Sequence, residues 1–579
     1  MTMLTKWGAA LDRSCPLPEY PRPQLRRESF YNLNGVWDYA VTPSGDEPVV
    51  WDGEIVVPFS PEAPLSGAAR GPAKDEYLHY RRGFTLPKGF QKSRVLLHFG
   101  AVDQITEVFV NGVSAAKHSG GYWPFSADIT SLLREGENIL RVTVRDNADD
   151  PTFAYGKQRY KRGGMWYTAQ SGIWQTVWLE SVPEVYVKSL RITPEFDEAR
   201  VRIELETALE SSAAITCDVR AADGSFVAGS WAKGGVCVVP LPGFRAWTPD
   251  DPYLYTLDIT CGEDHVESYF AMRKFSYVEL DGHKVFGLNN APLFHNGLLD
   301  QGYYPDGLLT PPSDEAMVND IETMKRCGFN MLRKHIKIEP LRWYYHCDRL
   351  GMIVWQDMVS GGQPYSFLHV SALPTLGKVD LPDQDAKPYG RSGVLSRARF
   401  RREMADTVRL LYNCPCIALW TVFNEGWGQF DALDMANELK KLDPTRFIDH
   451  ASGWQDQGYE EMKSRHIYFR PVKLKNDGRA LALTEYGGYI LAVDGHRWTD
   501  KVFGYRICRN SAALAHDYEK LMLGQVLPHI RKEGLTAAVY TQITDVEEEL
   551  NGLMTYDREV LKIPEETLRE INAALRFDA

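Results

Sequence analysis

Apolar and polar positions alternate along most of the first half of the chain. Residues 94–113 form short alternating runs around the turn pair Asn111-Gly112, and NILRVTVRD (138–146) carries its apolar residues on one face. A period of two is typical of half-buried strands, and here no helical period lasts beyond a turn or two. We therefore expect residues 1–182 to form an all-β domain, a jelly roll or a sandwich.

Residues 183–280 continue the strand pattern. Their alternating runs are VYVKSLRITP, RVRIELETAL, AAITCDVRAADG and LYTLDITC. About one hundred residues of such strands favour an immunoglobulin-like β-sandwich, and the sequence does not imply the disulfide that such sandwiches often carry.

The pattern changes at residue 281, where short apolar runs begin to alternate with longer amphipathic ones. This alternation is typical of βα units. Helices are expected from the capping residue Ser313 to near Gly328, from Glu339-Pro340, with the proline in the first turn, to Gly351, and around Phe400 to Leu411. Eight strands with helices between them predict a (β/α)8 TIM barrel over residues 281–579. The expected strands are 292–299, 328–334, 351–357, 417–424, 446–451, 464–469, 480–485 and 535–543.

A long segment rich in glycine and proline, Val359 to Gly393, follows the third expected strand. In a barrel this connection lies over the C-terminal face, where active sites form. The same composition is equally compatible with a loop that has no fixed structure.

Composition narrows the classes of partner. The chain has 579 residues, a formal net charge of −12 and a pI near 5.7. This excess of acidic residues disfavours nucleic acids and anionic membranes as partners, because binding them requires a basic patch on the protein. The nine cysteines are scattered without a CxxC pair, so free thiols in a reducing compartment are expected. With no leader-like N-terminal segment and no membrane-length apolar run, we expect a cytoplasmic protein.

Two glutamates end apolar strands of the predicted barrel. Glu425 follows CIALWTVFN, Glu485 follows ALALT, and glycines come soon after each. A single glutamate after a strand is ordinarily an exposed loop residue. Two of them at strand ends of one barrel, the first preceded by Asn424, suit glycoside hydrolysis, which uses a pair of carboxyl groups.

Motifs along the whole chain resemble those of glycoside hydrolase family 2, the β-galactosidase, β-glucuronidase and β-mannosidase group. They are LNGVWDYA (33–40), SGIWQTVWLE (171–180), WTPDDPYLYTL (247–257), FAMRKF (270–275), GFNMLRKH (328–335), YYHCDRLGMIVWQD (344–357), WTVFNEGWG (420–428) and LTEYGG (483–488). The resemblance implies a sugar-binding-like jelly roll, an immunoglobulin-like domain and a catalytic TIM barrel.

The resemblance also implies roles for single residues. Glu425 matches the family's general acid/base, and Glu485 matches its nucleophile. Asn424 would bind the sugar 2-hydroxyl, His335 would contact the glycone, and Asp357 stands where the family has a carboxylate after the third strand. A retaining mechanism requires carboxyl groups about 5–5.5 Å apart.

Weaker candidates lie at the ends of the fifth and sixth strands. Trp454, His466 and Tyr468 are candidates for lining the pocket. Core packing or surface structure explains Trp454 better, whereas the two explanations balance for His466. Arg333 either orients a carboxylate or forms a buried ion pair that holds the barrel together.

The segment after the eighth strand holds further candidates. Gln542, Asp545 and Asn551 are candidates for binding sugar hydroxyls, although a capping run explains the acidic residues 547–549 equally well.

The sequence narrows the sugar only in part. The Asn-x-Lys motif with which family β-glucuronidases bind the sugar carboxylate is absent, so a uronate would need another cation. Gly488 replaces the histidine that follows the nucleophile in family β-galactosidases. We predict an exo-acting β-galactosidase-like enzyme. The alternatives are β-glucuronidase or galacturonidase, β-mannosidase and arabinopyranosidase activity, or a carbohydrate-binding protein without catalysis.

Cofactor and assembly predictions rest on the same resemblance. Family β-galactosidases often bind Mg²⁺ and Na⁺, but Val359 stands where a ligating histidine would be expected near Asp357. No obligatory metal is therefore predicted. The expected partner is an oligosaccharide or glycoside, and a homo-oligomer is compatible with the family.

Overall fold

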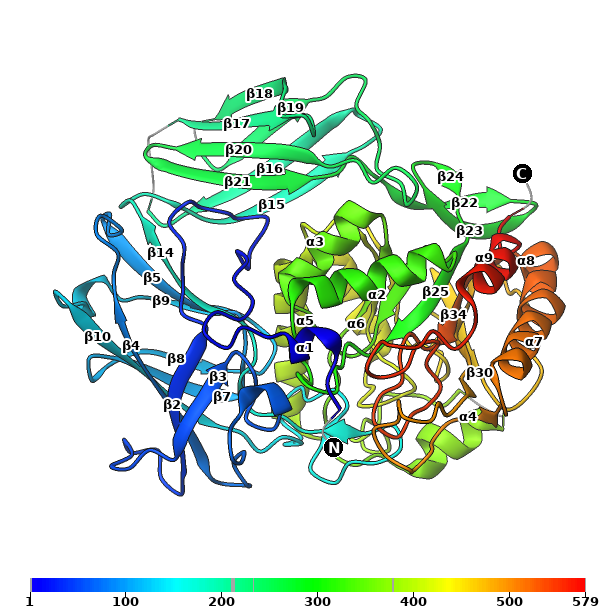
Figure 1. The fold of residues 1–579 in the computed structure, drawn as a ribbon. Coiled ribbons are helices and arrows are strands. Elements are labelled where there is room, and N and C mark those ends of the chain that lie inside the picture. The colour runs from blue at the N-terminus through cyan, green and yellow to red at the C-terminus, as the bar shows by residue number, and fades with distance from the viewer. Residues whose placement is uncertain (1–2, 210–213, 233, 377–379, 578–579) are drawn as a thin grey trace.

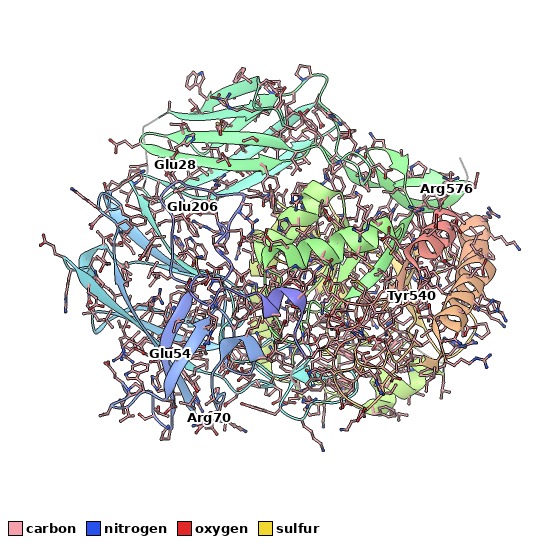
Figure 2. The ribbon with its side chains drawn as sticks, in the orientation of Figure 1. Glu28, Glu54, Arg70, Glu206, Tyr540 and Arg576 are labelled. Atoms are coloured by element: carbon pink, nitrogen blue, oxygen red, sulfur yellow. The ribbon has the colours of Figure 1, made fainter. Side chains whose placement is uncertain are left out.

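The computed structural model describes residues 3–209, 214–232, 234–376 and 380–577. Figure 1 shows the first β domain, in blue to cyan, at the left and the second, in cyan to green, at the top, beside a barrel that runs from green to red. The polar residues Glu54 and Arg70 lie on the outer surface of the first β domain, whereas Tyr540 lies among the packed side chains of the barrel (Figure 2).

The N-terminal domain consists of two packed antiparallel sheets. Its core of valines and leucines, with Trp37 and Tyr80, lies between them, because alternate residues of each strand point inward. One sheet has the order β3 (Gly53–Val57), β2 (Gly35–Thr42), β4 (Tyr77–Thr85), β10 (Glu137–Arg145), β7 (Ile105–Val110) and β8 (Val113–Ser119). The other has β1 (Tyr31–Asn32), β14 (Val177–Val182), β5 (Arg94–Phe99) and β9 (Phe125–Asp128).

Short elements complete this domain. They are α1 (Lys6–Ala9), the 3-10 turns η1 (Pro64–Ser66) and η2 (Thr130–Leu132), and the paired strands β11 (Gln158–Arg159) with β12 (Tyr167–Thr168) and β13 (Gly172–Ile173) with β6 (Val102–Asp103).

The second domain is a β-sandwich of three and four strands. Its core includes Cys217, Cys237 and Cys261, and all nine cysteines of the chain are free thiols. The sheets have the orders β15 (Val187–Glu195), β16 (Arg200–Thr207), β19 (Val236–Pro240), and β18 (Phe226–Ala232), β17 (Ile215–Arg220), β20 (Tyr255–Cys261), β21 (Asp264–Phe270).

A small sheet closes the N-terminal end of the barrel. It contains β22 (Phe275–Leu280), β23 (His283–Leu288) and β24 (Ala291–Pro292). Phe286 of this sheet packs in one core with Trp355 and Phe447 of the barrel. The domain boundary expected at residue 280 falls inside the β22–β23 hairpin, and the domain limits stay a prediction.

The eight strands expected for the barrel are all present in one parallel sheet, which confirms the predicted fold. Ladders join seven neighbouring pairs, and no ladder is found between β29 and β30 among the described residues, so the barrel is nearly closed. The order is β29 (Phe447–Asp449), β28 (Ile417–Thr421), β27 (Ile353–Asp357), β26 (Met331–Lys334), β25 (His295–Asp300), β34 (Leu535–Thr541), β31 (Ala480–Gly487) and β30 (Met462–Ile467).

The predicted helix ends also agree with the structure. Ser313 caps α2, where its hydroxyl accepts a hydrogen bond from the Ala316 amide at 3.2 Å. Gly351 ends α3 with φ +73°, and a Cβ there would lie 2.3 Å from the Pro249 carbonyl oxygen. The helices are α2 (Asp314–Arg326), α3 (Leu341–Leu350), α5 (Val394–Leu411), α6 (Ala432–Leu442), α7 (Ser511–Leu521), the π-helical turn η4 (Met522–Val526), α8 (Leu527–Glu533) and α9 (Glu565–Ala573). The strand pair β32 (Tyr489–Ile490) and β33 (Arg506–Ile507) lies between β31 and α7.

The long segment after β27 contains the π-helical turn η3 (Leu368–Ala372) and α4 (Leu373–Thr375). It also contacts the N-terminal domain, because the Ser360 carbonyl accepts hydrogen bonds from the amides of Tyr155 at 3.0 Å and Gly156 at 2.9 Å. Among the described residues, no helix combines the length and apolar character that crossing a bilayer requires.

Candidate active site

Glu425 stands just beyond the C-terminal end of β28. Its amide donates to the Ser452 carbonyl at 2.9 Å, and Asn424 forms a bridge with Ser452. Glu425 has φ +51°, a left-handed conformation that is strained for a residue with a side chain. The chain therefore turns sharply here and directs the carboxyl group over the barrel's C-terminal face.

Glu485 lies within β31, at an irregularity of the strand. Register shifts interrupt the β31 ladders with both β30 and β34 near this residue. Its carboxylate receives the Arg333 guanidinium, with Nη1 at 3.1 Å from Oε1, and the Tyr468 hydroxyl, which donates to Oε2 at 2.6 Å. Both carboxylate oxygens are thus held in place.

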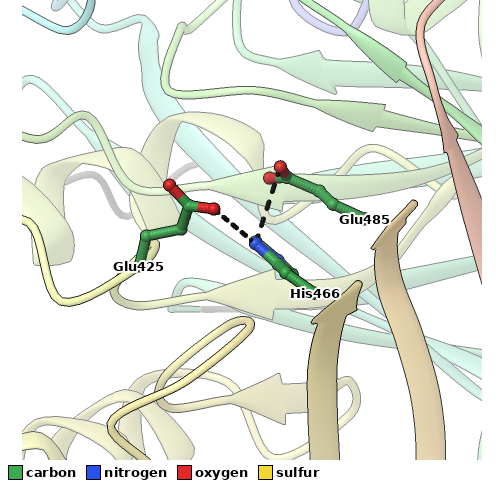
Figure 3. Close-up of side chains that lie close together, drawn as sticks. All are labelled: Glu425, His466 and Glu485. Atoms are coloured by element: carbon green, nitrogen blue, oxygen red, sulfur yellow. Dashed lines mark hydrogen bonds and ion pairs between the residues drawn. The ribbon is translucent and has the colours of Figure 1, made fainter. Parts of the chain in front are cut away.

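His466 lies between the two glutamates (Figure 3). Its Nδ1 is 2.8 Å from Glu425 Oε1 and 3.5 Å from Glu485 Oε2. One oxygen of each carboxyl group and this nitrogen all lie within 4.8 Å of one another. Glu425 follows β28, whereas His466 and Glu485 lie on the paired strands β30 and β31, and the barrel brings the three side chains together.

Burial sets the protonation of these groups. It raises the pKa of Glu425 to about 7, against the opposing charges of Lys157 and Arg333. Burial also raises the pKa of Glu485, whereas His466, Arg333 and the Tyr468 hydroxyl favour its ionised form. Burial lowers the pKa of His466 to about 4, so its imidazole is neutral near pH 7. Among the described residues, Arg333 is in direct contact with Glu485 and no cation is in direct contact with Glu425, so the surroundings favour the ionised form more at Glu485 than at Glu425.

Arg333 lies beneath the residues that line the site and is fully buried. It binds both oxygens of Asp357 at 3.0 Å each and donates to the Asn424 amide oxygen at 2.8 Å. This one guanidinium therefore joins four barrel strands, so the two roles considered for Arg333 coincide. The Asn424 amide nitrogen is buried without a partner in the described structure and is free to donate to a ligand.

The Asp357 carboxylate fixes the orientation of the His335 ring. Its Nδ1 is 2.8 Å from Asp357 Oδ2, and burial lowers the pKa of the imidazole to about 3. The neutral ring therefore donates from Nδ1, which leaves Nε2 as an acceptor.

A cavity of about 280 Å³ opens above these groups. Seven of the predicted site residues line it: His335, Asn424, Glu425, Trp454, His466, Tyr468 and Glu485. Five others do not line it: Arg333, Asp357, Gln542, Asp545 and Asn551.

Gln542 and Asn551 act one layer behind the cavity. The Gln542 amide nitrogen donates to Asn551 at 2.8 Å, and its oxygen accepts from the Gln301 amide at 2.8 Å. Gln301 itself lines the cavity, and its own amide oxygen is buried without a partner among the described residues. The pair therefore positions Gln301 rather than reaching the cavity.

Several lining residues were not among the predicted ones. Gln301 directly follows the first barrel strand, so a search for polar residues at the C-terminal ends of the barrel strands would have found it. For Glu549 a capping run was an equally good explanation; its buried carboxylate accepts the Tyr167 hydroxyl beside the cavity. Lys157 comes from the N-terminal domain, and nothing in the sequence near it indicated a site. Trp427 and Tyr505 are also in this group.

The mouth of the cavity is apolar. Phe367 and Phe469 line it while 73% and 71% exposed, respectively, and Trp454 donates its indole N–H to the Glu425 carbonyl at 3.0 Å. The segment from residue 359 to 393 thus contributes to the cavity through Phe367 and Ser371.

Three family models match successive parts of the chain. They describe the sugar binding domain of glycosyl hydrolases family 2 (residues 64–183), glycosyl hydrolases family 2 (185–273) and its TIM barrel domain (310–474). The chain belongs to glycoside hydrolase family 2.

Within this family, the chain is similar to proteins named as β-galactosidases and to proteins named as β-glucuronidases. It is 23% identical over 502 residues to a β-galactosidase of Halalkalibacterium halodurans, covering 78% of this chain and 45% of that one. It is 22% identical over 535 residues to a β-glucuronidase of Paenibacillus borealis, covering 82% and 85%. The chain spans less than half the length of the first curated relatives that it matches.

A solved structure shares the whole fold. The β-glucuronidase of an uncultured Clostridium species matches with a TM-score of 0.74 at 19% identity, over 95% of this chain and 99% of that one. At this identity, the likeness shows a shared fold.

Proposed function

We propose that this family 2 chain is a retaining exo-β-glycosidase, with Glu485 as nucleophile and Glu425 as general acid/base. The observation that carries the proposal is the closeness of the two carboxyl groups, whose nearest oxygens lie within 4.8 Å. Retaining enzymes hold these groups about 5–5.5 Å apart, whereas inverting enzymes leave about 6.5–9.5 Å for a water molecule.

The first step exchanges one bond at the anomeric carbon for another. Glu485 attacks this carbon and forms an ester, the glycosidic C–O bond breaks, and the departing oxygen takes the proton of Glu425. Arg333 and Tyr468 hold the attacking carboxylate, while the unpaired Asn424 amide hydrogen is available for a sugar hydroxyl.

The second step reverses the proton transfer. Glu425, now ionised, takes a proton from water, the hydroxide oxygen bonds to the anomeric carbon, and Glu485 leaves as a carboxylate. The Arg333 guanidinium, which can only donate, lies 3.5 Å from His466 Nε2, so the neutral imidazole carries its proton on Nδ1. From there it donates to Glu425 Oε1 and stabilises this ionised form. Two displacements leave the configuration retained.

The cavity favours a terminal sugar over a polymer chain. Its volume of about 280 Å³ is just below the usual range of about 300–1,000 Å³ for small-molecule sites. β-Galactosidase-like specificity stays our prediction from the sequence, with the uronidase, mannosidase and arabinopyranosidase alternatives.

His466 Nδ1 and one oxygen each of Glu425 and Glu485 lie close enough together to hold a metal ion. In this structure, however, His466 donates to Glu425, and Glu485 is already paired with Arg333. We therefore assign the triad to proton transfer and nucleophilic attack, and the prediction of no obligatory metal is left to experiment.

The test is turnover of p-nitrophenyl β-glycosides by the wild type, Glu425→Gln and Glu485→Gln. Glu460→Gln is the matched control, because Glu460 is exposed and belongs to the same barrel. We expect cleavage of at least one glycoside, lost in Glu485→Gln and kept in the control, with a product of retained configuration by NMR. Sugar binding without cleavage would instead favour a carbohydrate-binding protein, and an inverted product would exclude the proposed mechanism.

A further inference from the structure

A buried lysine from the N-terminal domain faces the cavity. Lys157 is only 6% exposed, and its ammonium lies 5.5 Å from the centroid of the Tyr167 ring and 5.8 Å from that of Trp427. Within the described residues it forms neither an ion pair nor a side-chain hydrogen bond. A buried ammonium is normally paired, because removing it from water is costly.

The position of Lys157 is fixed by contacts between the domains. The preceding residues Tyr155 and Gly156 donate to the Ser360 carbonyl, and Ala154 forms a bridge with Gly361. Gly156 has φ +63°, and a Cβ there would come within 2.9 Å of the Ile336 carbonyl oxygen. The backbone thus docks closely onto the barrel and holds the lysine beside the catalytic groups.

The acidic groups of the cavity are already engaged elsewhere. Glu485 is paired with Arg333, and Glu549 accepts the Tyr167 hydroxyl. Glu425 is the proton donor of the first step and is uncharged when substrate binds. The ammonium therefore lacks an anionic partner at that stage.

We propose that Lys157 is a specificity-determining residue that binds an oxyanion group on the glycone, the carboxylate of a uronic acid or a sulfate ester. The inference rests on the proposed function, since it assumes that the sugar occupies this cavity. The Asn-x-Lys motif is absent from the chain, so here the cation would come from another domain. A glycone with such a group would supply the missing partner, whereas a neutral sugar would leave the ammonium buried and unpaired.

Binding tests this inference without requiring catalysis. Calorimetry would compare D-glucuronate and D-galacturonate with D-glucose and D-galactose, and galactose 6-sulfate with galactose. The proteins are the wild type, Lys157→Met, Lys157→Arg and the control Lys161→Met, which removes an exposed charge from the same segment. Thermal unfolding would confirm that each variant is folded.

We expect at least one oxyanion sugar to bind about 10- to 100-fold more tightly than its neutral parent. Lys157→Met should abolish this ratio, Lys157→Arg should retain part of it, and Lys161→Met should leave it unchanged. Comparison of the uronates with the sulfate identifies the group. Equal binding of charged and neutral sugars, or a ratio that survives in Lys157→Met, would overturn the inference.

Turnover separates this inference from the proposed function. Preferential binding of an oxyanion sugar without cleavage of any β-glycoside would contradict the glycosidase while the role of Lys157 stands. Cleavage of neutral glycosides alone, with no preference for charged sugars in binding, would leave the glycosidase and refute the role of Lys157.

Discussion

Removal of the Tyr468 hydroxyl should change the pH dependence of the reaction in a defined direction. This hydroxyl donates to Glu485 Oε2 at 2.6 Å and lowers the pKa of that carboxyl group. The ring itself is held by stacking on Tyr505, with centroids 3.8 Å apart, so Tyr468→Phe should keep its position. The substitution therefore removes the hydrogen bond to Glu485 and the hydroxyl's contact with Thr541 Oγ1 at 2.9 Å, and leaves the ring in place.

The magnitude follows from the type of bond. A hydrogen bond to a charged group contributes about 1.5–3 kcal/mol, and about 1.4 kcal/mol corresponds to one pH unit. Glu485 must be ionised to attack, and loss of the donor raises its pKa. The acidic limb of kcat/KM should thus move to higher pH by about one to two units.

The assay is kcat/KM for the best p-nitrophenyl glycoside across the pH range in which the protein stays folded. Tyr505→Phe is the control, because the Tyr505 hydroxyl has no hydrogen bond to Glu485 in the described structure. An acidic limb that stays in place, or that moves to lower pH, in Tyr468→Phe would refute the assignment of Glu485 as the group that must be ionised.

Three further outcomes are expected. In the wild type, kcat/KM should fall above about pH 7, because burial raises the pKa of the proton donor Glu425 to about 7. Glu425→Gln should remove this basic limb, as pH profiles of both proteins would show. It should also slow turnover about 10²- to 10⁴-fold, and by less for glycosides with a 2,4-dinitrophenyl leaving group. Arg333→Met should lower the free energy of unfolding by about 3–5 kcal/mol in urea titrations, because it leaves buried Asp357 without its bidentate partner, and an unchanged midpoint would contradict this. Dialysis against EDTA should leave kcat/KM unchanged, since Arg333 already pairs with Glu485, and recovery on addition of Mg²⁺ would show that a metal is needed.

The closeness of Glu425 and Glu485 was predictable because a parallel barrel converts sequence position into spatial position. The C-terminal ends of all strands lie on one face, so Glu425 and Glu485 had to be close once the strands were identified. The strands were identifiable because each is a short apolar run between amphipathic segments, and all eight are present.

The depth of each polar residue was not predictable in the same way. Arg333 and His335 lie two residues apart near the end of β26, yet one lies beneath the site and the other lines the cavity. Periodicity gives the face of a strand but not whether a long side chain reaches the substrate or a neighbouring carboxylate. Gln542 shows the same limit, because its amide supports Gln301 one layer behind the cavity.

Contributions from another domain leave still less trace in the sequence. Lys157 reaches the cavity because backbone contacts at Ser360 and Gly361 dock the two domains, and such contacts carry no side-chain pattern. Its charge matters only through its surroundings, since a lysine in an all-β domain is ordinarily solvated. The carboxylates proposed for the chemistry can thus be read from the barrel alone, whereas the proposed choice of sugar depends on how the barrel and the first domain meet.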